Sequence, residues 1–265
     1  MTVLSDIIAG VREDLEERRA QVSLEQMKER AAAAAPARSF APQEFGLICE
    51  VKRSSPSKGS LADIADPAEL AAAYEAGGAH AISVLTEKRR FGGSLEDFAA
   101  VRARVDVPLL RKDFMVDEYQ VYEARAYGAD IILLIVAALD DKQMRSLYEL
   151  ARELGMAVLV EAHTSEEIAR AAKLGAKILG VNTRNLKDLS VDFARFAPLA
   201  AEATGHTHLV AESGVATSAE VELYAAAGAD LVLVGEALVK HGDPQTAVAE
   251  FTRAGRAQRS PQRIL

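Results

Sequence analysis

The sequence predicts a single (βα)8 TIM barrel, an α/β fold, with extra helices at its amino terminus. From Gly46 onward, eight short runs rich in Val, Ile and Leu alternate with alanine-rich amphipathic segments. Uninterrupted apolar runs are typical of parallel strands that are covered on both faces. Eight strand-helix units favour a closed barrel, because open doubly wound sheets usually have five or six strands.

Strands are expected where an apolar run ends in a polar or glycine-containing loop. Their ranges are 47–52, 81–86, 108–113, 130–136, 157–162, 177–182, 208–213 and 231–236. Helices are expected between them, several opened by Ser, Thr or Asp and closed by Gly, as helix capping favours. The phrase "GAD" or a close relative precedes the second, fourth, sixth and eighth strands, where a helix ends and a buried strand begins.

Residues 1–45 do not join this repeat. The segments "LSDIIAGVREDLEERRAQ" and "SLEQMKERAAAAA" predict two helices, followed by a proline-containing connector to the first strand. We expect this extension to pack on the barrel and cover one end, and the alternative is an extension without a role in the site. The catalytic domain is expected at 46–255, and the basic residues 256–265 are expected to form a frayed tail.

Composition excludes several classes of protein. Hydrophobic residues make up 49% of the 265 residues and charged residues 26%, as in soluble globular proteins, and a net charge of −8 argues against nucleic acid as a partner. We expect no signal peptide, because acids stand where its basic region would be, and the longest apolar run, 131–139, is shorter than the roughly 20 residues of a membrane span. A cytoplasmic protein that binds no membrane is expected, with a monomer as the working assumption.

Polar residues at the carboxyl ends of the strands predict the site. In such barrels the active site lies there, and alternate strand residues point inward. The stretch "ICEVKRSSPSKG" puts Glu50 and Lys52 on one face of its strand and Cys49 on the other. Charged residues in apolar strands are costly to bury unless they are paired or functional. The predicted catalytic group is Glu50, Lys52, Lys112, Glu161, Asn182 and Glu212.

The residues of the loops after the strands predict what kind of ligand binds, with a phosphate at one end and an apolar group at the other. "ESGVAT" and "LVGEAL" follow the last two strands, where glycines and helix starts can offer backbone N–H groups to a phosphate. Phe91, Phe114, Pro56 and Leu186 lie just after strand ends and predict an apolar wall of aromatic size. A phosphorylated small molecule is therefore the expected partner. The single cysteine, Cys49, excludes an internal disulfide and a zinc site with two thiolates.

Together these motifs resemble one family. "CEVKRSSPSKG", "LTEKRRFGGSLEDF", "PLLRKDFMVDEYQ", "LVEAHT", "LGVNTRNL", "VAESGV" and "LVGEAL" resemble indole-3-glycerol-phosphate synthase over nearly the whole chain. The resemblance implies a carboxy-lyase of tryptophan biosynthesis. Such an enzyme closes the pyrrole ring of 1-(2-carboxyphenylamino)-1-deoxyribulose 5-phosphate, releases carbon dioxide and water, and forms indole-3-glycerol phosphate without a metal or an organic cofactor.

The resemblance also implies roles for the catalytic group. Lys112 is the general acid for ring closure, while Lys52 holds anionic groups of the substrate and is a candidate to protonate the leaving hydroxyl. The sequence leaves open which lysine serves which step. Glu161 is the base, and Glu50 and Glu212 orient the lysines and keep them charged.

Substrate contacts are implied in the same way. Asn182 and Arg184 match positions that contact hydroxyl and anionic groups, and the Arg184 fork suits a planar acid. Glu236 stands where some relatives have serine, so we expect backbone N–H groups to hold the phosphate and the carboxylate to turn away. The expected substrate-binding residues are Ser55, Pro56, Ser57, Phe91, Phe114, Leu133, Arg184, Leu186 and Ser213, and the phosphate-binding residues are Gly214, Gly235 and Glu236.

Three alternatives use the same barrel. A Schiff-base aldolase would use Lys52 or Lys112 as a nucleophile. Phosphoribosylanthranilate isomerase would need a cysteine and an aspartate, and Cys49 has the wrong parity on its strand. A catalytically silent barrel would bind a phosphorylated ligand without turnover, although every expected acid and base position is occupied.

Overall fold

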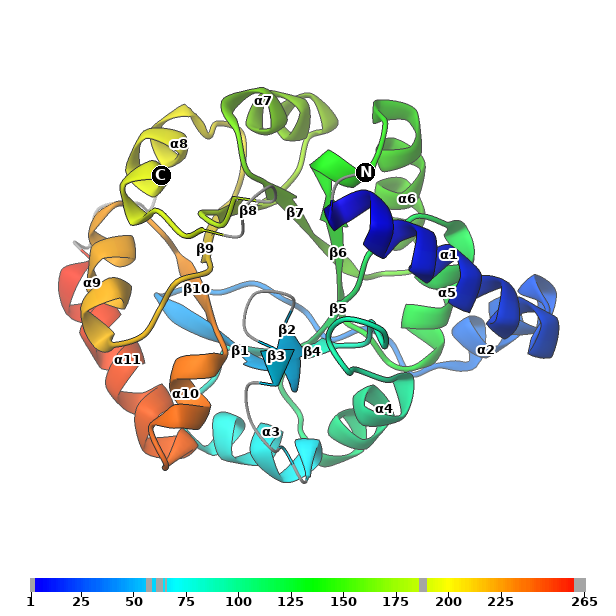
Figure 1. Ribbon diagram of the computed structural model, residues 1–265, viewed down its shortest axis with the longest axis horizontal. Coiled ribbons are helices and arrows are strands. Elements are labelled where there is room, and N and C mark those ends of the chain that lie inside the picture. Colours follow the sequence, from blue (N-terminus) through cyan, green and yellow to red (C-terminus); the bar gives the residue numbers. More distant parts are fainter. Residues whose placement is uncertain (1–2, 56–58, 61–63, 65, 186–189, 260–265) are drawn as a thin grey trace.

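The predicted barrel is confirmed. The structure is a computed structural model that describes residues 3–55, 59–60, 64, 66–185 and 190–259. Pro56, Ser57 and Leu186 lie outside the described residues, as does the side chain of Ser55. In the described chain, eight parallel strands close into a barrel in the order β1-β10-β9-β8-β7-β6-β5-β4, with helices around them (Figure 1).

The strands are close to their expected ranges. They are β1 (Gly46–Val51), β4 (Ala81–Leu85), β5 (Leu109–Lys112), β6 (Ile131–Ile135), β7 (Ala157–Ala162), β8 (Ile178–Asn182), β9 (His208–Glu212) and β10 (Leu231–Val234). Most end earlier than expected, because pairing stops where the loops diverge. The loop after β1 also contains an antiparallel pair, β2 (Ser54–Ser55) and β3 (Gly59–Ser60), which the sequence pattern did not indicate.

Helices alternate with the strands. They are α3 (Pro67–Ala76), α4 (Leu95–Arg104), α5 (Glu118–Ala126), α6 (Asp141–Glu153), α7 (Ser165–Leu174), α8 (Phe196–Glu202), α9 (Ser218–Ala226), α10 (Glu236–Lys240) and α11 (Pro244–Gln258), with 3-10 turns η1 (Val136–Ala138) and η2 (Phe193–Arg195). Two expectations need correction. Glu236 begins α10 instead of ending the last strand, and α11 continues past Gly255, where the tail was expected to begin. No described helix has the length and apolar character to cross a bilayer.

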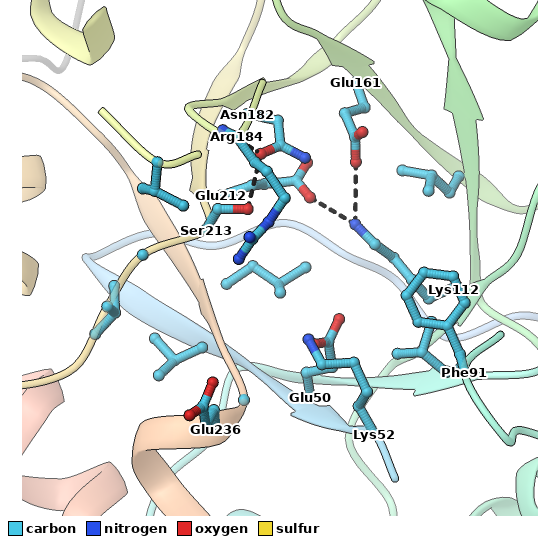
Figure 2. A pocket seen from close by; sticks show the side chains of 18 of the residues that line it. Glu50, Lys52, Phe91, Lys112, Glu161, Asn182, Arg184, Glu212, Ser213 and Glu236 are labelled. Atoms are coloured by element: carbon cyan, nitrogen blue, oxygen red, sulfur yellow. Dashed lines mark hydrogen bonds and ion pairs between the residues drawn. The ribbon is translucent and has the colours of Figure 1, made fainter. Parts of the chain in front are cut away.

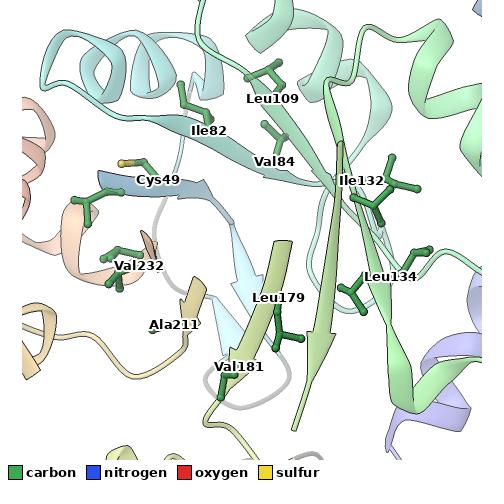
Figure 3. Close-up of a cluster of buried hydrophobic side chains, with 14 of the residues drawn as sticks. Cys49, Ile82, Val84, Leu109, Ile132, Leu134, Leu179, Val181, Ala211 and Val232 are labelled. Carbon is green, nitrogen blue, oxygen red and sulfur yellow. The ribbon is translucent and has the colours of Figure 1, made fainter. Parts of the chain in front are cut away.

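Strand parity divides the core into two layers. Side chains such as Ile48, Leu110 and Leu159 fill the inside of the barrel. The alternate residues, among them Cys49 and Val84, pack between the sheet and the helices (Figure 3). The expected outward direction of Cys49 is therefore confirmed. Glu50 and Lys52 have the parity of Ile48, which directs them to the interior of the barrel at its carboxyl end.

The repeated "GAD" segments form turns and hydrogen bonds at the amino-terminal end of the barrel. Gly128 and Gly228 have left-handed φ values of 87° and 100°, which a glycine adopts without the steric cost of a Cβ. The following aspartates then bind the neighbouring strand: Asp130 Oδ2 accepts from the Leu109 N–H at 2.8 Å, and Asp230 Oδ2 accepts from the Leu209 N–H at 2.6 Å. Each aspartate thus satisfies a backbone donor at the start of a strand.

The amino-terminal extension consists of α1 (Val3–Gln21) and α2 (Leu24–Ala33). Ser23 begins α2 with a capping box. Helix α2 packs on α5, and α1, dark blue in Figure 1, contacts η1 and is linked to α5 through Arg18 and Glu123. Ile7, Val11 and Leu15 are the buried face of α1. The extension therefore shares a hydrophobic core with the barrel helices.

A buried ion network ties α1 to strand β5. Arg111 has the outward parity on β5 and is 1% exposed. Its Nη2 lies 3.0 Å from Asp113 Oδ2 and 2.9 Å from Glu123 Oε2 on α5. The other oxygen of Glu123 accepts from Arg18 Nε of α1 at 2.8 Å. Because Glu123 is shared by two guanidinium groups, it links the extension to the barrel wall.

We expect Glu123→Gln to lower the free energy of unfolding by about 3 kcal/mol, because it removes the shared anion from a buried pair. Glu118→Gln is the matched control: Glu118 lies on the same helix but is exposed, and its loss should cost less than about 0.5 kcal/mol. Urea unfolding followed by circular dichroism measures both. Equal midpoints for the two variants would contradict the role of Glu123.

Candidate active site

A cavity of about 700 Å³ lies at the carboxyl end of the barrel. It collects polar residues from most of the strands, since the ends of parallel strands meet at this face. The expected site residues that line it are Glu50, Lys52, Phe91, Lys112, Phe114, Leu133, Glu161, Asn182, Arg184, Glu212, Ser213, Gly214, Gly235 and Glu236. All the expected site residues with described side chains therefore lie in one cavity.

Lys112 forms the centre of the cavity. Its Nζ lies 3.1 Å from Glu161 Oε2 and 2.6 Å from Glu212 Oε2, and Figure 2 shows the ammonium between the two carboxylates. Burial alone would lower the pKa of Lys112, but Glu161, Glu212 and Glu50 outweigh burial and raise that pKa above its usual range. The lysine is therefore charged at neutral pH.

The two glutamates differ although they share one lysine. Burial raises the pKa of Glu212 to about 8, with Lys112 opposing the shift and Glu161 adding to it. Burial also acts on Glu161, but Lys112 and His163 outweigh it and hold the pKa of Glu161 well below its usual range. At neutral pH this pair thus consists of one protonated and one ionised carboxyl group. Gly180 leaves the space for Glu212, because a Cβ there would lie 2.2 Å from Glu212 Oε1.

Glu50 and Lys52 lie across the cavity from this centre (Figure 2). Lys52 Nζ donates to Glu50 Oε1, so the spacing of two along the strand does pair an acid with a cation. The backbone is held from behind, where the buried Tyr74 hydroxyl donates to the Glu50 carbonyl at 3.3 Å. Gly235 lies against Glu50, and its Cβ would meet Glu50 Oε1 at 3.0 Å.

Asn182 is oriented by two hydrogen bonds. Its Oδ1 accepts from Ser213 Oγ at 2.8 Å and from the Arg184 N–H at 3.0 Å. Ser213 has a φ of 77°, a left-handed conformation that is costly for a residue with a Cβ. The Tyr224 hydroxyl helps to hold that conformation by donating to the Ser213 carbonyl at 2.9 Å. The amide plane of Asn182 is thereby fixed beside the two glutamates.

One end of the cavity is formed by backbone from the last two loops. Gly214 follows Ser213 with a φ of 87°, and a Cβ there would lie 2.6 Å from Val191. Gly235 is the residue that precedes α10. Glu236 also faces the cavity, and its Oε1 accepts from Lys240 Nζ at 2.6 Å. Sequence reasoning missed Lys240, which is recognisable only as an i,i+4 partner once α10 is known.

The other end is apolar. The Phe91 and Phe114 rings lie 6.0 Å apart between centroids, near Leu133 of β6. Sequence reasoning missed further apolar lining. Leu85, Ile135 and Leu233 could have been found from strand parity, whereas Val3, Leu4 and Ile7 of α1 become part of the cavity only through tertiary packing. It also missed His163, which follows Glu161 at i+2 in "LVEAHT" and lies 3.3 Å from it.

Two solved structures share the fold. The first is 3-hexulose-6-phosphate synthase from Salmonella typhimurium, with a TM-score of 0.66 and 17% identity, which covers 81% of this chain and 100% of that one. The second is thiamine phosphate pyrophosphorylase from Pyrococcus furiosus, with a TM-score of 0.61 and 18% identity, which covers 81% of this chain and 96% of that one. At such identities the likeness supports the barrel fold alone.

Sequence comparison gives the family. The model of the indole-3-glycerol phosphate synthase family matches residues 4–251. Proteins of that name from Arthrobacter sp. (strain FB24) and Streptomyces griseus are 59% and 60% identical to this chain, covering 96% of it and 97% and 96% of their own lengths. One from Mycolicibacterium smegmatis is 55% identical over 96% of this chain and 95% of its own. The chain belongs to the indole-3-glycerol phosphate synthase family.

Proposed function

We propose that this chain is an indole-3-glycerol phosphate synthase, a carboxy-lyase of tryptophan biosynthesis. The observation that carries the proposal is the order of groups in one cavity. A charged centre of Lys112, Glu161 and Glu212 lies between an apolar end and a glycine-rich backbone end. A substrate with an aromatic ring, a polar ketose chain and a phosphate needs these three environments in this order.

The two ends suit the two ends of 1-(2-carboxyphenylamino)-1-deoxyribulose 5-phosphate. The aryl ring would pack against Phe91 and Phe114, and its carboxylate matches the guanidinium of Arg184. The phosphate would lie at the backbone of Gly214 and Gly235. Lys240 neutralises Glu236 at that end, which reduces the repulsion between the carboxylate and a phosphate dianion.

Ring closure requires an acid. The ring carbon that bears the carboxylate attacks the ketose carbonyl, and the developing oxyanion needs a proton. Lys112 supplies it in this proposal, because its raised pKa keeps it protonated before the reaction. The same charge disfavours the Schiff-base aldolase reading, which needs a neutral amine as nucleophile. Loss of carbon dioxide then restores the aromatic ring.

Dehydration requires an acid and a base. The ring hydroxyl leaves with a proton from the acid, and the adjacent ring carbon loses a proton to the base. Glu161 is the proposed base because its lowered pKa keeps it ionised. Lys52, paired with Glu50, is the proposed acid, while Asn182 holds a substrate hydroxyl. The assignment of each lysine to a step is part of the proposal.

The amino-terminal extension is proposed to cover the aryl end of the site. Val3, Leu4 and Ile7 of α1 line the cavity, and Arg89 in the loop after β4 ties α1 down through Glu13 and Asp14. Covering the cavity would exclude water from the charged centre and strengthen the interactions there. This gives residues 1–45 a part in the site.

The function is tested by adding the arylamino ketose phosphate to the purified protein and following indole fluorescence. The chain contains no tryptophan, so the protein background is low. We expect turnover in the wild type and a loss of about 10²- to 10⁴-fold in Glu161→Gln, which cannot accept the proton. Glu166→Gln, an exposed neighbour, should match the wild type. Binding without any turnover in the wild type would favour the silent barrel, and no binding would show that the ligand is wrong.

Lys112→Met is expected to abolish ring closure, with kcat reduced by at least about 10²-fold, because no ammonium remains to protonate the oxyanion. Substrate affinity, measured by calorimetry, should change little, since the ring and phosphate contacts are elsewhere. Lys173→Met, on an exposed position of α7, is the control. Near-normal turnover in Lys112→Met would remove Lys112 from the mechanism.

The proposal that α1 covers the aryl end of the cavity is tested by Leu4→Ala. We expect the substrate KM to rise about fivefold, because roughly 1 kcal/mol of apolar contact is lost, with a smaller change in kcat. Ile8→Ala is the matched control on the same helix, since Ile8 packs on the core and does not line the cavity. Removing the chain before Glu44 should raise KM further if the truncated protein folds. An unchanged KM in both variants would refute the cover.

A further inference from the structure

We propose that His163 is a positioning residue for Glu161. Its ring, held between Glu161 and Glu167, places a positive charge behind Glu161 and so keeps the negative charge of the Glu161 and Glu212 pair on Glu161. The inference deepens the proposed function, in which Glu161 is the base, and rests on it for the meaning of that charge. His163 does not line the cavity, so it acts on the substrate only through Glu161.

The geometry fixes the ring of His163. The residue is 4% exposed and follows β7 directly. Its Nε2 lies 3.3 Å from Glu161 Oε1, and its Nδ1 lies 3.2 Å from Glu167 Oε2. The backbone N–H of His163 donates to the same Glu167 oxygen at 2.7 Å, and Arg195 Nη2 donates to the His163 carbonyl at 2.7 Å. Strand end, helix α7 and turn η2 therefore all hold this residue.

Both ring nitrogens face carboxylate oxygens. Nδ1 is hydrogen-bonded to Glu167, whereas Nε2 lies at ion-pair distance from Glu161 without a hydrogen bond. A neutral imidazole has only one N–H, and a lone pair that faces an acid is unfavourable, so this arrangement favours the imidazolium. The groups that act on the ring agree with this: burial lowers its pKa, but Glu161 and Glu167 outweigh burial and raise the pKa to about 9. Arg195 contacts the backbone carbonyl of His163, and its charge is not among the causes of the shift. A charged His163 at neutral pH follows.

The second cation makes the two glutamates unequal. Glu161 has Lys112 at Oε2 and His163 at Oε1. Glu212 has Lys112 at Oε2, but its Oε1 is buried without a hydrogen-bond partner among the described residues. Two adjacent carboxylates with one shared ammonium do not both ionise readily, so the proton goes to the carboxyl with fewer cations. His163 thus decides that Glu212 keeps the proton and Glu161 acts as the base.

The competing explanation is that His163 only fastens α7 to the end of β7. A fastening role would lower the melting temperature and reduce kcat by the same factor at every pH. A charge-setting role predicts a change that depends on pH, because loss of the imidazolium raises the pKa of Glu161. The two roles are therefore separated by a pH profile.

The kinetic test compares the wild type with His163→Gln, which retains a polar group without a charge. We expect the acid limb of the kcat profile to move up by about one pH unit, so that kcat falls by up to about tenfold on that limb and stays within about twofold near pH 8.5. KM should stay within about twofold. His241→Gln is the matched control, since His241 pairs with Glu250 on the surface at 3.4 Å. A His163→Gln profile that keeps its shape would overturn the proposal.

A second measurement does not depend on turnover. Carbon-13 NMR of the side-chain carboxyls in the full chain should find Glu161 ionised and Glu212 protonated at pH 7, and His163→Gln should raise the titration midpoint of Glu161. Equal Glu161 midpoints in the wild type and the variant would overturn the inference even if the enzyme is active. A shifted midpoint in a protein that does not turn over the substrate would support the charge assignment and reject the proposed function alone.

Discussion

The alternation of strand side chains in a closed parallel barrel is the constraint on which the rest of this structure depends. It directs Glu50 and Lys52 to the interior while Cys49 faces the helices. The same rule brings Lys112 and Glu161 together from strands that are not neighbours in the sheet. Once the register is set, these charged side chains lie inside the end of the barrel, and their mutual pairing offsets the cost of burial.

The fold and most of the cavity were predictable because they depend on local patterns. Apolar runs with polar ends gave the strands, and parity gave the inward direction of residues such as Glu212. The contribution of α1 was not predictable in detail, because Leu4 and Ile7 reach the cavity through tertiary packing that leaves no period in the sequence. The start of α10 at Glu236 was missed because the apolar run of the last strand continues up to Gly235 and does not reveal where pairing stops.

The electrostatics of the site were also beyond the sequence. Three carboxyl groups and two lysines can be read from strand ends, but which carboxyl group is protonated depends on its burial and on the charged groups around it in the folded chain. Glu161 and Glu212 look equivalent in the sequence, but in the structure both contact Lys112 and His163 lies beside Glu161. The positions of polar residues at strand ends predict which side chains form the site. Their protonation states depend on which charged groups lie next to each of them in the folded chain.

Strand β5 connects the two halves of the molecule. Its consecutive residues Arg111 and Lys112 point to opposite sides of the barrel wall, the first toward the network that anchors α1 and the second into the cavity. Arg111, which anchors α1, and Lys112, whose ammonium lies between the two glutamates, are therefore adjacent in the sequence. An insertion or deletion of one residue in β5 would exchange the two cations, so the length of this strand is fixed for both purposes at once.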